Sequence, residues 1–174
     1  MYVLSQIFVV VSGILFALSY LTKKKALLLI LNVFNNIFFG THFLLLKSST
    51  AAYSVFLTIL FLIAIYFIEK YNKEKFYFIV TIFCSLVLII ISIITWDGPL
   101  SLMPTISVLL TFVGSALKHT LTVKLFYFVS TVLNTIFMFI IASYFGFGVN
   151  IAILITAVFG IVKEIITIKN KQKV

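Results

Sequence analysis

The chain has 174 residues, of which 63% are hydrophobic and 10% are charged, and its mean hydropathy is +1.29. A water-soluble domain of this length cannot bury so much apolar surface, so the composition excludes soluble classes of protein. The 13 basic residues, all lysines, and 4 acids give a net charge of +9. Because the lysines lie between apolar runs rather than along one face, the sequence predicts the lipid bilayer, and not nucleic acid, as the partner.

Seven apolar segments are long enough to cross a membrane, since the hydrocarbon core is about 30 Å thick and requires about 20 helical residues. No basic region precedes the first segment, which argues against a cleaved signal peptide. The last break, at Gly146 to Gly148, is the shortest, and its two glycines favour an interruption there. The segments are Val3–Leu21, Ala26–Leu46, Ala51–Ile68, Phe76–Thr95, Leu100–Leu117, Leu125–Phe145 and Gly148–Ile168.

The lysines predict the orientation of these segments. With the N-terminus outside, twelve lysines fall on the cytoplasmic side and only Lys47 falls outside. This strong asymmetry is what the positive-inside rule requires, and it would fail for an even number of spans. We therefore expect an external N-terminus and a cytoplasmic C-terminus, with Trp96 and Asp97 at an outer interface.

The chain also contains signs of an internal repeat. A shift of 99 positions aligns Asn35 with Asn134 and Lys25 with Lys124, in addition to several apolar matches. This shift superposes the first three segments on the last three and leaves the fourth unpaired. We expect an all-α polytopic membrane protein with a 3+1+3 plan of two parallel triple-helix bundles, residues 1–72 and 98–174, joined by a linker helix in residues 73–97. Carriers with parallel repeats hold their substrate near the midplane between the halves.

Several local strings carry a family resemblance. They are His42-Phe43-Leu44-Leu45, Pro104, Ala116-Leu117, Leu121-Thr122-Val123-Lys124 and Ser130-Thr131. In these the chain resembles the YgjV-type bacterial inner-membrane proteins, which implies a multi-pass protein of the bacterial cytoplasmic membrane. Its 3+1+3 plan resembles the SWEET, PQ-loop and PnuC-type carriers, although the Pro-Gln pair of that wider group is incomplete here, and the single tryptophan is interfacial.

The sequence contains no motif typical of an enzyme. GxSxG, HExxH, CxxC, GxxxxGK[ST] and GxGxxG are all absent, and the four acids provide no paired carboxylates for acid and base chemistry. Cys84 is the only cysteine, so we expect neither a disulfide nor a thiol metal site. We therefore expect no catalytic activity, no cofactor and no metal.

A few polar residues at membrane depth are the candidates for substrate binding, because such groups are costly in hydrocarbon and normally face a cavity or another helix. They are Asn35, Asn134, Thr58, Asn36 and Asn150. Asn35 and Asn134 would present amides from the two halves, whereas Asn150 lies near the start of its predicted span and could instead cap it. The structural alternative is that these amides only bond neighbouring helices together.

His42 and Pro104 are the candidates for gating. His42 lies toward the outer end of its span, where it could control access or carry a proton, or could simply bond to a backbone carbonyl. Pro104 should break the hydrogen-bond ladder of its helix and act as a hinge or a static kink. Lys163 and Glu164 form the common interfacial arrangement of a lysine with a neighbouring acid.

The hypothesis that unites these features is a carrier or facilitator for a small, polar, neutral solute, such as a sugar, nucleoside or vitamin precursor, that works by alternating access. Tyr53, Tyr127 and the phenylalanines would offer stacking surfaces to such a solute, and a homo-oligomer is possible. The alternative is a non-transporting membrane protein that acts as an assembly partner or regulator.

Overall fold

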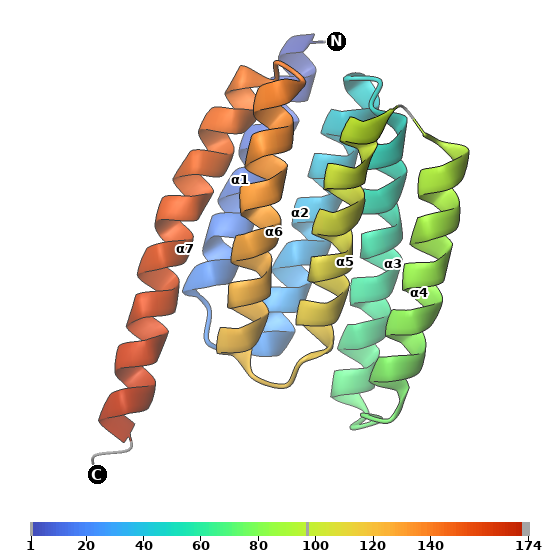
Figure 1. Ribbon diagram of the computed structural model, residues 1–174. Coiled ribbons are helices and arrows are strands. Elements are labelled where there is room, and N and C mark those ends of the chain that lie inside the picture. The colour runs from blue at the N-terminus through green and yellow to red at the C-terminus, as the bar shows by residue number, and fades with distance from the viewer. Residues whose placement is uncertain (1, 97, 172–174) are drawn as a thin grey trace.

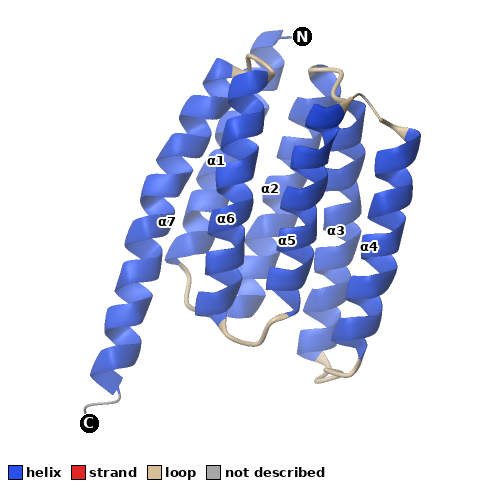
Figure 2. Cartoon of the chain, viewed as in Figure 1, coloured by secondary structure: helices blue, strands red, loops and turns tan. Residues whose placement is uncertain are grey.

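The computed structural model describes residues 2–96 and 98–171 as a bundle of roughly aligned helices, with the loops confined to its two ends (Figure 1, Figure 2). Asp97, expected at the outer interface, lies outside the described residues. The elements are α1 (Tyr2–Leu21), α2 (Lys25–Leu45), α3 (Ser49–Lys70), α4 (Phe76–Ile94), the 3₁₀ turn η1 (Pro99–Ser101), α5 (Leu102–Ala116), α6 (Thr120–Ile140) and α7 (Tyr144–Lys171).

The predicted number of spans is confirmed. Within the described chain, seven helices are long and apolar enough to cross a membrane, and the shortest, residues 99–116, consists of η1 and α5 together. The two ends of the chain lie at opposite ends of the bundle, as an odd number of spans requires (Figure 1).

Six helices form a closed ring in which each packs against two neighbours. The order around the ring is α1, α2, α3, α5, α6 and α7, and α7 closes it by packing on α1. The remaining helix, α4, packs against α3 and α5 at the edge of the bundle (Figure 1). Most of its side chains are exposed, which suits a surface in contact with lipid.

Two glycines allow close helix contact within the ring. A Cβ on Gly13 of α1 would lie 2.3 Å from Val149 Cγ1 of α7, and one on Gly114 of α5 would lie 2.5 Å from Phe126 Cβ of α6. Small residues let neighbouring backbones approach, which is how membrane helices gain packing energy without a hydrophobic driving force between them. Gly13 and Gly114 therefore lie where a larger residue would force two ring helices apart.

Two helix connections match each other in detail and lie 95 positions apart. Lys47, between α2 and α3, has a φ of 61°, and Ala142, between α6 and α7, has a φ of 56°. In both turns the next amide donates to a carbonyl of the preceding helix: Ser48 N to Phe43 O at 3.1 Å, and Ser143 N to Met138 O at 2.9 Å. The helix bounds agree, since α2 covers residues 25–45 and α6 covers residues 120–140. At this spacing, α2 and α3 correspond to α6 and α7.

The repeat spacing of 99 predicted from the sequence is therefore wrong by one helical turn. Residues four positions apart lie on the same face of a helix, so a shift of 99 and a shift of 95 match the same faces. Asn35 corresponds to Ser130, and Asn134 corresponds to Phe39.

The break predicted at Gly146 to Gly148 is also misplaced, and so is the boundary between the segments Leu125–Phe145 and Gly148–Ile168. The observed turn covers residues 141–143, because the left-handed Ala142 lets three successive amides bond to carbonyls of α6. Both glycines lie inside α7. A Cβ on Gly146 would lie 2.9 Å from Ser143 Oγ, so this glycine serves packing rather than a break.

Two apolar clusters lie at different depths in the bundle. The larger, at the lysine-rich end, is built around side chains such as Tyr20, Phe61 and Phe112, and it receives residues from all seven helices. The smaller, near the opposite end, includes Phe43 and Phe137. Most of the buried asparagines and many buried serines and threonines lie between the two clusters.

A lysine and a glutamate form an ion pair at the lysine-rich end of each set of corresponding helices. Lys25 Nζ of α2 lies 2.6 Å from Glu69 Oε2 of α3, and Lys124 Nζ of α6 lies 2.5 Å from Glu164 Oε2 of α7. The glutamates are 95 positions apart, whereas the lysines are 99 apart, so Lys124 lies one turn deeper. The partner of Glu164 is thus Lys124, across helices, and not the neighbouring Lys163, which is exposed.

Candidate functional site

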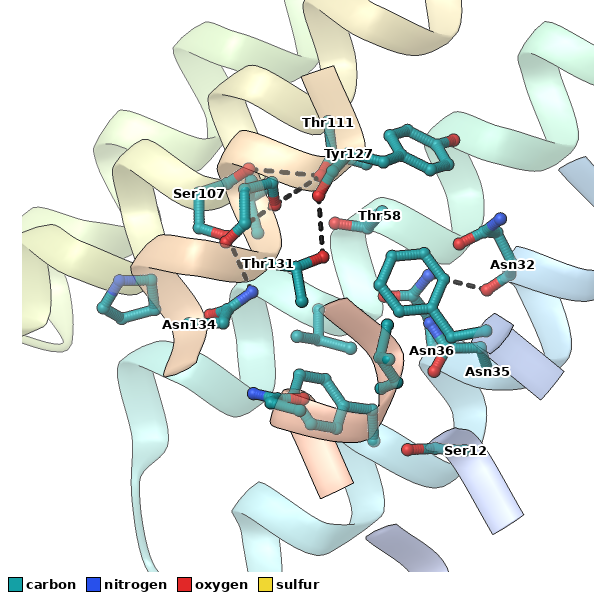
Figure 3. Close-up of a pocket in the computed structure, with 18 of the residues that line it drawn as sticks. Ser12, Asn32, Asn35, Asn36, Thr58, Ser107, Thr111, Tyr127, Thr131 and Asn134 are labelled. Carbon is teal, nitrogen blue, oxygen red and sulfur yellow. Dashed lines mark hydrogen bonds between the residues drawn. The ribbon is translucent and has the colours of Figure 1, made fainter. Parts of the chain in front are cut away.

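A small polar cavity lies inside the ring of six helices (Figure 3). Its volume of about 40 Å³ has room for about three water molecules. Every helix of the ring contributes to its wall, and α4 contributes none of the lining residues. The wall consists of Ser12 and Phe16 from α1; Asn32, Asn35, Asn36, Phe39 and Phe43 from α2; Val55 and Thr58 from α3; Pro104, Ser107, Val108 and Thr111 from α5; Tyr127, Ser130, Thr131 and Asn134 from α6; and Asn150 and Ile153 from α7.

All five residues predicted to bind substrate lie in this wall. They come from four helices, and their shared position is consistent with a common site, although their role in binding stays a prediction. Pro104, predicted as a gating residue, also lines the cavity. His42, the other gating candidate, does not. The five are Asn35, Asn134, Thr58, Asn36 and Asn150.

The side of the cavity formed by α5 and α6 is a connected hydrogen-bond network, which we call the hydroxyl wall: Ser107, Thr111, Ser130 and Asn134. Asn134 Nδ2 donates to Ser107 Oγ at 2.7 Å, and the hydroxyls of Ser107 and Ser130 are 2.7 Å apart. The Thr111 hydroxyl lies 3.2 Å from that of Ser130. These bonds join α5 to α6, so the polar groups of this wall already stabilise a helix contact.

The opposite side, which we call the amide wall, consists of Asn32, Asn35, Asn36 and Asn150. Asn32 Nδ2 donates to the Leu28 carbonyl at 2.9 Å, and Asn36 Nδ2 donates to the Asn32 carbonyl at 2.6 Å. These bonds stay within α2 and use only one donor of each amide.

Asn35 and Asn150 have the side-chain amides of this wall with the most unused hydrogen-bonding capacity. Asn35 is 6% exposed, and no hydrogen bond to its side chain is found among the described residues. Asn150 Nδ2 is buried without a hydrogen-bond partner. Because α7 begins at Tyr144, Asn150 is well inside the helix and does not cap it, contrary to the alternative drawn from the sequence. Both amides remain able to bond to a guest in the cavity.

Aromatic rings add apolar surface to the site. Phe16 and Tyr127 have ring centroids 6.0 Å apart, and the Tyr127 hydroxyl lies 2.6 Å from Ser115 Oγ, so that ring is fixed. Phe39 and Phe43 line the cavity toward the smaller apolar cluster. Tyr53, proposed from the sequence as a stacking surface, is 50% exposed and does not line the cavity.

His42 is buried beside the cavity but faces α1. Its Nδ1 lies 2.9 Å from the Ser5 carbonyl oxygen and 2.7 Å from Ser5 Oγ. A carbonyl oxygen only accepts, so the bond to Ser5 requires a proton on Nδ1. The Phe39 ring, which lines the cavity, is nearly parallel to the imidazole at a centroid distance of 6.3 Å. His42 therefore makes the backbone bond that was the structural alternative to a gate.

Pro104 does not break the ladder of its helix. It is the third residue of α5, and the amides of a first turn have no partner within the helix. The predicted hinge or kink at this position is therefore wrong, because the helix begins later than the apolar run suggests. The position of Pro104 in the cavity wall is a separate fact and keeps it in the candidate site.

The hydroxyl wall was missed from the sequence, apart from Asn134. Serine and threonine are common in apolar helices, so single residues of this type attract no notice. Their spacing contains the signal, since residues 104, 107, 108 and 111 in α5 and residues 127, 130, 131 and 134 in α6 recur at intervals of three and four.

The two sides of the cavity correspond at the spacing of 95. Ser12 and Phe16 match Ser107 and Thr111, and Val55 and Thr58 match Asn150 and Ile153. In α2 and α6, the lining residues at 32, 35, 36 and 39 match those at 127, 130, 131 and 134. The positions are preserved, but the chemistry differs, with amides in α2 and mainly hydroxyls in α6.

The chemistry of the wall is neutral hydrogen bonding. Within residues 2–96 and 98–171, no lysine, aspartate, glutamate or histidine lines the cavity. In the part of the chain that the structure describes, no three histidine, cysteine, aspartate or glutamate residues gather as metal ligands would. The amides and hydroxyls supply donors and acceptors but no group that would transfer a proton easily at neutral pH.

Among comparisons with known proteins, only the family model gives a match. Neither the curated proteins nor the solved structures include a match to the chain. The family model Imp-YgjV, described as a bacterial inner membrane protein, matches residues 3–167, which run from the start of α1 to near the end of α7. A multi-pass location in the bacterial inner membrane accords with the seven helices. The chain belongs to the Imp-YgjV family of bacterial inner membrane proteins.

Proposed function

We propose that this protein is a carrier or facilitator for a small, neutral, polar solute in the bacterial inner membrane. The observation that supports this function is the cavity itself, which is lined by amides and hydroxyls from six helices and lies between two apolar clusters. Polar groups at membrane depth are expensive, and unpartnered amides such as Asn150 Nδ2 are more so, unless a guest bonds to them.

The moving parts are two halves of three helices, α1–α3 and α5–α7, with α4 as the linker. The ring of contacts supports this division, because exchanging the halves maps each contact onto another: α3 on α5 becomes α7 on α1. Such parallel repeats are related by an axis along the membrane normal, with the site between the halves. The plan resembles that of the SWEET and PnuC-type carriers.

Each half contains an ion pair between two of its own helices. The ion pairs Lys25–Glu69 and Lys124–Glu164 both join helices of the same half. The contacts between halves are mainly apolar, such as Phe61 against Phe112 at a centroid distance of 4.2 Å. Ion pairs that join helices within each half, together with apolar contacts between the halves, suit a motion in which each half moves as a unit. The lysine distribution orients the N-terminus outside and the C-terminus in the cytoplasm.

The solute class follows from the wall. Without a charged group in the lining, an ion would lose its hydration with no compensation. A neutral molecule with hydroxyl or heterocyclic groups can bond to Asn35 and Asn150 and place an apolar face on Phe16 or Tyr127. Since about 40 Å³ holds only a few waters, the halves must separate to admit it.

Uptake into proteoliposomes tests the function. The purified protein is reconstituted and offered radiolabelled sugars, nucleosides and vitamin precursors, with empty liposomes as the blank. Uptake of at least one neutral solute, and loss of that uptake in Asn35→Leu, would support the carrier. No uptake above the blank for the whole panel would contradict it.

One observation favours the alternative of a non-transporting assembly partner or regulator. The hydroxyl wall is bonded across α5 and α6, as expected for polar groups that only hold helices together. Under this alternative the amide wall would also serve packing. Asn35→Leu would then destabilise the protein as much as Asn134→Leu, and no solute would raise its melting temperature.

A further inference from the structure

A second cavity opens between α3, α5 and α6 at the end of the bundle where the N-terminus lies. Its volume is about 130 Å³, larger than that of the central cavity. We call it the outer cleft. It is lined by Ser48, Thr50, Leu100, Ser101, Pro104, Phe137 and Ile141.

The outer cleft is separated from the central cavity by very little protein. Pro104 lines both spaces, so its ring is a shared wall. Phe137 lines the outer cleft and packs against Phe43 at a centroid distance of 6.0 Å, and Phe43 lines the central cavity. Pro104 and this aromatic pair are therefore the residues that both spaces share or that touch across them.

The chemistry of the outer cleft matches that of the central cavity. Its polar lining consists of the hydroxyls of Ser48, Thr50 and Ser101, and among the described residues no charged side chain lines it. Thr50 Oγ1 donates to the Thr95 carbonyl, and Ser101 Oγ donates to the Gly98 carbonyl at 2.7 Å. Thr50 Oγ1 also accepts from the Thr95 hydroxyl at 3.0 Å and keeps one lone pair, whereas Ser101 Oγ has both lone pairs left to accept hydrogen bonds from a guest.

The corresponding region of the other half contains buried polar groups without partners. At the spacing of 95, Ser101 corresponds to Gln6, Phe137 to His42 and Ser48 to Ser143. Both amide atoms of Gln6, His42 Nε2 and Ser143 Oγ are buried and make no hydrogen bond. Such groups cost free energy in a dry protein, so this seam between α1, α2 and α7 has the lining of a cleft that is closed here.

From these features we propose that the outer cleft is the entrance and first binding site, on the outer side, for the same neutral, hydroxyl-bearing solute that the central cavity takes. The entrance lies on one side of the ring, at the seam of α3, α5 and α6, while the corresponding seam is closed in this state. The inference rests on the proposed carrier function for its solute and on the cavity geometry for its location.

Paired cysteine labelling tests the location. Cys84, the single cysteine, is first replaced in Cys84→Ala, and Ser48→Cys or its counterpart Ser143→Cys is added. Right-side-out membrane vesicles are treated with a membrane-impermeant sulfonate methanethiosulfonate reagent. Ser48→Cys should react at least about ten-fold faster than Ser143→Cys, because only the first lines the open cleft. Equal labelling after unfolding in detergent shows that both thiols are intact.

Two further measurements address the solute. Glycerol and glucose, used as neutral probes, should slow the labelling of Ser48→Cys, whereas sulfate should not. Labelling should also lower the uptake by Ser48→Cys below the level that the same variant shows before labelling. Equal labelling rates at the two positions, or labelling of Ser48→Cys only in inside-out vesicles, would overturn the entrance. If even unlabelled protein takes up no solute, the carrier function fails, and the labelling ratio alone still decides whether the entrance exists.

Discussion

The two walls of the central cavity hold polar groups at matching positions but use them differently. In the hydroxyl wall, Ser107, Ser130 and Asn134 bond to one another across α5 and α6. In the amide wall, Asn35 and Asn150 retain unused hydrogen-bonding capacity. A bonded group already contributes to the stability of the fold, whereas an unpartnered group lowers it and gains only when a guest binds. Under the proposed function, we therefore expect the hydroxyl wall to serve mainly structure and the amide wall to serve mainly binding.

The largest expected effect concerns the two Lys–Glu ion pairs, which are buried to different extents in the two halves. The Lys124 and Glu164 side chains are 2% and 15% exposed, against 6% and 35% for Lys25 and Glu69. Lys124→Met leaves Glu164 buried without its partner and should cost about 3 kcal/mol of unfolding free energy. Lys25→Met should cost less, because Glu69 reaches solvent and keeps a hydrogen bond from Tyr77. Reaction of the buried Cys84 thiol with a fluorogenic maleimide during heating measures both.

Lys163→Met is the control for this comparison, because Lys163 is exposed on the same helix as Glu164 and should leave the melting temperature unchanged. A larger loss in Lys25→Met than in Lys124→Met would reverse the ranking of the two halves.

The next effect separates the walls directly. Asn134→Leu removes the donor to Ser107 and should lower the free energy of unfolding by about 2 kcal/mol. Asn35→Leu breaks no such bond, so its stability should stay close to that of the unchanged protein, while solute affinity falls at least about ten-fold. Melting temperature with and without the transported solute measures both quantities. Equal destabilisation by the two variants would show that the amide wall is also structural.

A smaller effect comes from a matched pair of serines, Ser107 and Ser12, which are 95 positions apart and both line the cavity. Ser107 bonds across to Ser130, whereas Ser12 Oγ donates only to the Val9 carbonyl of its own helix, at 3.1 Å. Ser107→Ala should therefore cost about 1 kcal/mol, and Ser12→Ala should cost close to zero. Chemical unfolding in mixed micelles distinguishes them, and equal losses would remove the distinction between the two walls.

Much of the fold is readable from sequence because the bilayer imposes long apolar runs, and lysines are excluded from its core. The number of spans and the five cavity residues proposed to bind substrate follow from those constraints together with the cost of polar groups at membrane depth. Helix ends are less readable. The turn at Ala142 is made by backbone bonds and a left-handed residue, which leave no glycine signal, so the nearby glycines misplace the break.

The repeat spacing shows a second limit of prediction from the sequence. A helical pattern repeats nearly every four residues, so an apolar alignment cannot distinguish 95 from 99. The few polar matches, Lys25 with Lys124 and Asn35 with Asn134, selected the wrong turn, because the lysine of the second half lies one turn deeper and its asparagine occupies the position of Phe39. The kink expected at Pro104 was wrong for a similar reason, since a proline kinks a helix only if the helix begins well before it, and its gating role stays a prediction.

The smallest effect tests whether the two halves are equivalent outside the cavity. Lys47 and Ala142 both adopt positive φ, which costs a non-glycine residue about 1–2 kcal/mol, while glycine adds about 0.5–1 kcal/mol of unfolded-state entropy. These terms largely offset each other, so Lys47→Gly and Ala142→Gly should each stabilise the protein by about 0.5 kcal/mol. Thermal melts of both variants, and of Ser49→Gly as a helical control that should lose stability, measure this. Opposite signs at the two turns would mean that their shared geometry hides different strain, and the halves would then not be equivalent units.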